Sequence, residues 1–219
     1  MSTQQLIELD NAMLLNLNFS LNFNELTRRC FELRPVIVVN NGWFVTSKNI
    51  YCNEGVILLD SYSPSQYQLS GSELVPNFLL EQDELVVGRV ASDAQTSTSS
   101  LSAERFVTEL LKYEILWVKR AFEHVGEYLK GRSIESASAA KHPVITQLMA
   151  GIAQDIYVIS QVGDLKDKKN QQFVAEELYS IVSRLIKAAG GRSMLCGNLV
   201  QMDVMFKALN SVYLEKASV

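Results

Sequence analysis

The sequence predicts an α+β fold in which a small antiparallel β-region is followed by an antiparallel four-helix bundle. Three observations support this fold class. Short β-branched and aromatic runs fill the stretch 35–91, the segment 92–101 is polar and low in complexity, and apolar residues then recur with helical spacing. We therefore expect an N-terminal segment and small β-domain over 1–91, a linker over 92–101 and a bundle over 102–219.

The N-terminal part of the chain contains the predicted strands. Apolar and polar residues alternate over 15–24, and a period of two is typical of a strand with one buried face. A short helix or turn is expected between that strand and Pro35. Beyond Pro35, the runs VIVV, GWFVTS, GVILLD, YQLS and ELVVGRV predict five strands of one small sheet. The NNG sequence at 40–42 predicts a hairpin turn between the first two.

Four helices are predicted in the remainder of the chain. The first spans 102–131, with Ser102 as its N-cap. The second begins at Pro143, because proline is favoured at the first helical position. The third runs from about residue 171 to a pair of glycines, and the fourth begins near residue 195. Short connections between the helices favour an antiparallel bundle.

The first predicted helix has more apolar surface than one buried face requires. Tyr113, Ile115, Leu116 and Trp117 extend beyond its main apolar stripe. A helix that is apolar on more than one side usually buries the second side against another chain. We therefore expect the protein to form a homo- or hetero-oligomer.

Composition and charge narrow the classes of function. The 219 residues are 47% hydrophobic, and the net charge of −4 arises from 24 acidic and 20 basic residues that are interspersed. The sequence contains no basic cluster of the kind that binds a phosphate backbone, so we expect no nucleic-acid partner. It contains no signal peptide and no apolar run of about 20 residues, so we expect no membrane partner and a cytoplasmic location.

The cysteines and histidines do not predict a metal site. The three cysteines lie far apart and form no CxxC pair, and only two histidines occur. No GxSxG sequence is present either, so a catalytic triad is not predicted.

Three local sequences resemble segments of the acyl-CoA dehydrogenase family. The first helix ends in EYLKGR and the next begins HPVITQLMAGIAQD, which is similar to the family's Tyr-x-x-x-Arg sequence at the end of the first helix of its C-terminal domain. The junction IKAAGGRSMLCGN is similar to the family's Gly-Gly-x-Gly-Tyr segment. The segment NNGWFVTSKN is similar to the middle-domain strand that carries Trp-Ile-Thr or Trp-Ile-Ser.

The resemblance implies an FAD site that is shared across a subunit interface. In the family, the arginine reaches the pyrophosphate of the flavin held by the neighbouring subunit, and Arg132 is the matching residue. Gly190 and Gly191 match the paired glycines, whose backbone approaches the adenosine part of the same flavin. The physical chemistry agrees with both roles, because arginine offers a bidentate fork to a phosphate and glycine lets the backbone come close to a ligand.

The resemblance also implies residues for the flavin ring and for catalysis. Phe44, Val45 and Thr46 would lie against the ring. Some members of the family place the catalytic base at the start of the first helix of the C-terminal domain, where Glu104 lies in this chain. In the family reaction, a glutamate removes the α-proton of an acyl thioester while the flavin takes a β-hydride.

The sequence also departs from the family's pattern. Few residues precede the β-region where the family has an N-terminal helical domain, Arg132 is not followed by Phe-Gly, and no Glu-Gly-Thr sequence occurs near the C-terminus. The sequence therefore leaves several hypotheses. The chain is an acyl-CoA dehydrogenase-like subunit that acts with a fuller partner chain, or it is a non-catalytic, flavin-free shortened relative that serves as an interaction or structural module. A third hypothesis is a helical-bundle adaptor unrelated to the family.

Overall fold

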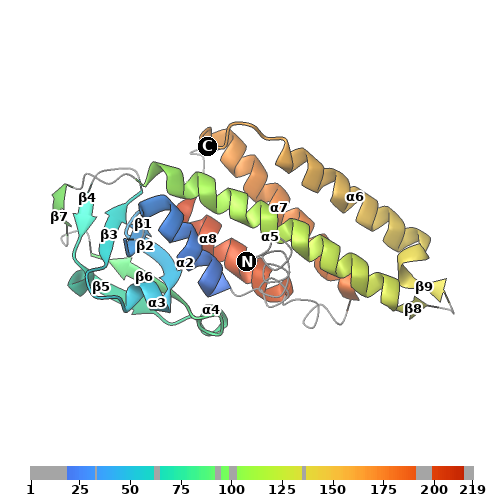
Figure 1. Cartoon of the computed structure of the whole chain (residues 1–219), viewed down its shortest axis with the longest axis horizontal. Coiled ribbons are helices and arrows are strands. Elements are labelled where there is room, and N and C mark those ends of the chain that lie inside the picture. Colours follow the sequence, from blue (N-terminus) through green and yellow to red (C-terminus); the bar gives the residue numbers. More distant parts are fainter. Residues whose placement is uncertain are drawn as a thin grey trace, which may run out of the picture.

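The computed structural model describes residues 19–32, 34–61, 65–91, 95–98, 103–134, 137–190 and 199–214. Figure 1 shows the strands between Val36 and Thr98 grouped at one end of the molecule and the long helices extending away from them. Buried residues of the strands and of the helices join in one hydrophobic core, which confirms the α+β fold class. No helix within these ranges is long and apolar enough to cross a membrane.

A helix, α2 (Phe19–Phe31), precedes the first strand. The strand predicted over 15–24 is therefore wrong from Phe19 onward, and the residues before Phe19 lie outside the described ranges. Helical spacing places Phe23 and Leu26 on one buried side of α2. The ring of Phe23 meets that of Phe106 edge-on, with centroids 5.9 Å apart. Packing against another helix, rather than the local alternation of apolar and polar residues, decides this conformation.

The strands form two sheets, one with the order β1-β3-β4-β7 and one with the order β2-β6-β5. Their bounds are β1 (Val36–Val39), β2 (Trp43–Ser47), β3 (Ile57–Asp60), β4 (Ser65–Tyr67), β5 (Ser72–Val75), β6 (Leu85–Val90) and β7 (Gln95–Thr98). The prediction of one antiparallel sheet is wrong, because β1 pairs with β3 in parallel and β2 pairs with β6 instead. The predicted strands VIVV, GWFVTS, GVILLD and ELVVGRV correspond to β1, β2, β3 and β6.

Short helical turns lie between several of the strands. They are α3 (Lys48–Tyr51), η1 (Leu69–Gly71) and α4 (Phe78–Glu81). The predicted strand YQLS is divided between the end of β4 and η1, and β5 is absent from the prediction. Strand β7 lies inside the segment predicted as a linker, where it pairs with β4.

The rest of the described chain is mainly helical. The long helices are α5 (Glu104–Gly131), α6 (Pro143–Ser160), α7 (Lys168–Ala189) and α8 (Leu199–Tyr213), and β8 (Ser133–Ile134), β9 (Ala137–Ser138) and η3 (Ala139–Lys141) connect α5 to α6. The predicted boundaries hold at Pro143, the first residue of α6, and at Gly190, the C-cap of α7. Helix α5 begins at Glu104 after Ala103, whereas the predicted N-cap, Ser102, lies outside the described ranges.

Helix α7 contacts α5, α6 and α8, and α8 also contacts β2 and α4. Helix α8 therefore lies between the other long helices and the three-stranded sheet. Within the same chain, α2 packs against α5, with Arg29 of α2 5.8 Å from the centre of the Tyr113 ring, and Trp117 stacks on Phe206 of α8. Ile115 and Trp117 are buried, whereas Leu116 remains 39% exposed. Most of the surface from which the sequence predicts a partner chain is thus covered internally.

Candidate functional site

The guanidinium group of Arg132 lies beside Gly190. Arg132 directly follows α5 and is exposed, and Gly190 ends α7 with a φ of 65°. This positive φ favours glycine, because a side chain is strained in that conformation. A β-carbon placed on Gly190 would lie 3.7 Å from Nη1 of Arg132. The fold thus brings together two of the residues that match the family's pyrophosphate and adenosine contacts; the third, Gly191, lies outside the described residues.

The connection after α5 fixes the backbone of Arg132. Its carbonyl oxygen accepts a hydrogen bond of 2.6 Å from the N–H of Ala139. The hydroxyl of Ser138 donates to the carbonyl oxygens of Leu129 and Lys130, at 3.3 and 3.0 Å, and so caps the last turn of α5. An exposed guanidinium on a fixed backbone suits a residue that reaches an anion on another molecule.

Phe44, Val45 and Thr46 lie in β2, toward the opposite end of the molecule from β8 and β9 (Figure 1). All three side chains are at most 1% exposed. The ring of Phe44 covers Gly88, its partner in β6, so closely that a β-carbon on Gly88 would lie 2.1 Å from a ring atom. The same ring stacks on Tyr51 with centroids 6.1 Å apart. Side chains of this chain therefore fill the space around Phe44.

The hydroxyl group of Tyr213 lies between β1 and β2. Its oxygen accepts a hydrogen bond from the N–H of Val45 at 3.1 Å, and it lies 2.7 and 3.0 Å from the carbonyl oxygens of Val45 and Val38, to which it donates. The side chain is fully buried, and burial raises the pKa of the phenol, so it stays protonated. The amide of Asn40 also donates to the carbonyl oxygen of Val212 at 2.6 Å. The end of α8 is thus fixed to the strand that matches the family's flavin-ring segment.

The predicted site residues on α5 lie at its two ends. Glu104 is the first residue of this 28-residue helix, and Arg132 follows its last residue. At 1.5 Å per residue the two positions are about 42 Å apart along the helix. A single ligand the size of a flavin dinucleotide cannot contact both within one chain. Among the described residues, no group of three or more histidine, cysteine or acidic side chains gathers as a metal site.

Comparison with known proteins gives matches at the level of structure. No protein-family model and no curated protein matches the sequence. A glutaryl-coenzyme A dehydrogenase in complex with glutaryl-CoA aligns with a TM-score of 0.51 and 7% identity, over 81% of this chain and 58% of that chain. A glutaryl-CoA dehydrogenase from Mycobacterium smegmatis in complex with FADH2 aligns with a TM-score of 0.51 and 10% identity, over 82% of this chain and 57% of that chain. A variant of the steroid ACAD Tcur3481-Tcur3483 aligns with a TM-score of 0.55 and 10% identity, over 80% of this chain and 57% of that chain.

The chain has the fold of the acyl-CoA dehydrogenases. This agrees with the family resemblance that the sequence predicts from the residues around Arg132, Gly190 and Phe44. The chain spans less than two thirds of the length of these solved structures. At 7% to 10% identity, the likeness extends to the fold, whereas the ligands named for those structures belong to those proteins.

The described residues fit FAD at one end of this acyl-CoA dehydrogenase fold better than at the other. The exposed Arg132 beside Gly190 fits an anionic phosphate group. In β2, the hydroxyl of Thr46 is buried without a hydrogen-bond partner among the described residues, which would suit a polar atom of a ligand. However, the ring of Phe44 already fills the space over Gly88, and the hydroxyl of Tyr213 already bonds the backbone of Val45, the residue before Thr46.

Proposed function

We propose that this chain is an acyl-CoA dehydrogenase-like subunit that contributes part of an FAD site at an oligomer interface and acts on an acyl thioester together with a partner chain. The proposal depends chiefly on one observation: Arg132 is exposed, fixed through its backbone, and directed beside Gly190 at the end of the molecule far from β2. An arginine placed there is suited to a ligand held mainly by another subunit. The partner is a second copy of the chain or a fuller acyl-CoA dehydrogenase-like chain.

The residues proposed to bind the pyrophosphate and adenosine of the flavin and the proposed catalytic base of this chain lie at two separate sites, at opposite ends of α5. At one end, Arg132 would pair with the pyrophosphate, and Gly190 with Gly191 would let the backbone approach the adenosine. At the other end, Glu104 is the candidate base, because a carboxylate within hydrogen-bond reach of an acyl α-proton removes it. FAD supplies the redox chemistry when it is bound. Phe44, Val45 and Thr46 would contact the ring only if the groups that enclose them, Tyr51 and Tyr213 among them, moved away.

A second candidate function is supported by a specific observation. Phe44, Val45 and Thr46 are buried by the chain's own side chains, and the hydroxyl of Tyr213 accepts a hydrogen bond from the backbone N–H of Val45. Breaking these contacts costs free energy, because the N–H of Val45 would lose its buried partner. These contacts favour the alternative hypothesis, a non-catalytic and flavin-free relative that serves as an interaction or structural module.

The absorbance spectrum of the purified protein tests these two candidates against each other. The chain is purified alone and after co-expression with the proteins encoded beside it. The shared-site proposal expects flavin bands in at least one preparation and their loss after Arg132→Ala. The matched control is Arg105→Ala, which removes an exposed arginine near the other end of α5. Colourless preparations that also fail to take up added FAD would contradict the shared site and support the flavin-free module.

A further inference from the structure

A groove lies between the N-terminal half of α5 and the connection from α6 to α7. Its volume is about 590 Å³, which is within the range of roughly 300–1,000 Å³ that is typical of small-molecule sites. Its apolar lining consists of Ile115, Leu116, Ile159, Val162 and Leu165. The side chain of Leu116 is exposed, so α5 presents an apolar group to solvent at this position. The groove therefore has an apolar lining beside the helix, in which Leu116 is the exposed side chain.

The charged residues of the groove are mostly cationic. Lys112, Lys119 and Lys166 belong to its lining, against the single carboxylate of Asp164. Lys112 and Lys119 are separated by two turns of α5, or about 10 Å along the axis, so they lie on the same side of the helix. Asp164 accepts a hydrogen bond of 2.9 Å from the backbone N–H of Lys166, and Lys112 pairs with Glu109 at 2.7 Å. An excess of positive charge thus remains in a chain whose net charge is −4.

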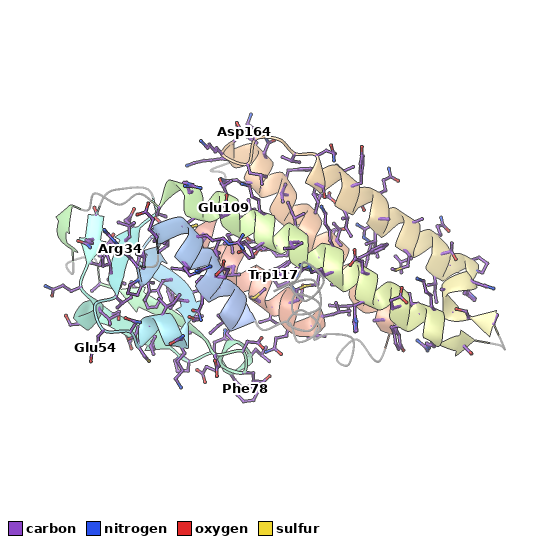
Figure 2. The ribbon with its side chains drawn as sticks, viewed as in Figure 1. Arg34, Glu54, Phe78, Glu109, Trp117 and Asp164 are labelled. Carbon is purple, nitrogen blue, oxygen red and sulfur yellow. The ribbon has the colours of Figure 1, made fainter. Side chains whose placement is uncertain are left out.

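Figure 2 labels Asp164, which lines the groove from the connection between α6 and α7, and Glu109, which lies on α5 outside the lining. The connection is held in place by several hydrogen bonds. The carbonyl oxygen of Leu165 accepts hydrogen bonds from the hydroxyl of Thr108 at 3.3 Å and from the amide of Gln171 at 2.9 Å. The amide of Asn170 donates to the carbonyl oxygen of Asp164 at 2.8 Å. The groove is therefore preformed, which lowers the entropy cost of binding.

We propose that this groove binds an anionic amphiphile, a molecule with a straight apolar chain that ends in a carboxylate or a phosphate. The apolar chain lies along Leu116 and its neighbours, and the lysine ammonium groups attract the anionic head. The site does not include Arg132, Gly190 or β2. The inference therefore goes beyond the proposed flavin function and does not depend on it.

Calorimetric titration of the full chain with octanoate, decanoate and decyl phosphate, each below its micellar concentration, tests the proposal. Because each buried methylene contributes about 0.8 kcal/mol, decanoate should bind up to about 15-fold more tightly than octanoate. The carboxylate and phosphate arms identify the preferred head group. Binding should weaken as salt increases, and decyltrimethylammonium, with the same chain and a positive head, should bind much more weakly. Equal binding of the cationic and anionic decyl compounds, or no binding of any anion, would overturn the proposal.

Two pairs of variants locate the site. Lys119→Gln should weaken decanoate binding by about two- to five-fold, as expected for one partly exposed ion pair, whereas Lys130→Gln, at the far end of α5, should leave it unchanged. Leu116→Asn should weaken it by a similar factor or more, whereas Leu79→Asn, an exposed leucine outside the groove, should not. If Lys119→Gln and Leu116→Asn both bind decanoate as the natural chain does, the groove is not the site. That result would leave the Arg132 proposal untouched.

Discussion

The phenolic oxygen of Tyr213 lies 3.1 Å from the backbone nitrogen of Val45 in β2 and 3.0 Å from the carbonyl oxygen of Val38 in β1. The last turn of α8 therefore joins the two strands that flank the hairpin turn at 40–42. The strand order explains why this contact is needed. Strand β1 pairs with β3 and β2 pairs with β6, so the facing edges of β1 and β2 have few hydrogen bonds to each other. The hydroxyl group of Tyr213 hydrogen-bonds to backbone groups of both strands, β1 and β2.

We predict that Tyr213→Phe lowers the free energy of unfolding by about 1–3 kcal/mol, because the N–H of Val45 is left buried without a partner. Urea denaturation measures the change. Tyr157→Phe is the matched control, since the Tyr157 side chain is 66% exposed and the variant should unfold as the natural chain does. Equal stability of the two variants would show that Tyr213 does not join the strands.

Gly88 is required because the ring of Phe44 occupies the position of a β-carbon, at 2.1 Å. Gly88→Ala forces the ring or a strand to move, so we expect a loss of about 1–3 kcal/mol of stability. Gly126→Ala is the control, because Gly126 lies in the interior of α5 and, apart from the backbone of its own helix, nothing lies within 4 Å of its added β-carbon. Alanine is favoured over glycine in a helix by about 1 kcal/mol, so this variant should gain stability. Thermal or urea unfolding that shows no loss for Gly88→Ala would contradict the packing described for β2.

Glu114 is fully buried in α5, and burial raises the pKa of its carboxyl group well above the ordinary 4.5, while the neighbouring Asn210 on α8 offsets part of the effect. The folded state therefore retains a proton that the unfolded chain releases. The stability contributed by neutral Glu114 is fully present below pH 4.5 and is lost as the pH rises through the higher folded pKa.

We therefore predict that Glu114→Gln gains stability relative to the natural chain as the pH rises above 4.5, because glutamine cannot ionise. Unfolding free energies measured across the pH range test this. The matched control is Glu127→Gln, which removes an exposed glutamate from the same helix. A difference between Glu114→Gln and the natural chain that stays constant with pH would contradict a proton held by Glu114.

The sequence predicts the long helices well because their signals are local. Pro143 begins α6, Gly190 ends α7, and apolar spacing over many residues marks α5. The same kind of local pattern fails at 19–24, where polar and apolar residues alternate but the segment is helical. The helical face of this segment is selected by contacts such as that of Phe23 with Phe106, which no local pattern contains.

The candidate site depends on contacts between distant parts of the chain. The proximity of Arg132 and Gly190 follows from the way α5 and α7 end side by side, and only the family resemblance suggests it in the sequence. Tyr213 escapes prediction because its partners Val45 and Val38 are 168 and 175 positions away. The groove lysines on α5 share a helix face, but the connection that completes the groove becomes apparent only in the fold.

Fluorescence titration with FAD and with FMN tests the central claim most directly, because only FAD carries the pyrophosphate and adenosine that Arg132 and Gly190 would contact. The protein is measured alone and as a complex purified after co-expression. We predict that FAD binds more tightly than FMN and that Arg132→Ala removes this preference, weakening FAD binding by about 10- to 100-fold for the loss of a charged hydrogen-bonding group, while Arg105→Ala does not. Binding of FAD that is unchanged by Arg132→Ala, or no binding of either flavin in both preparations, would contradict the account.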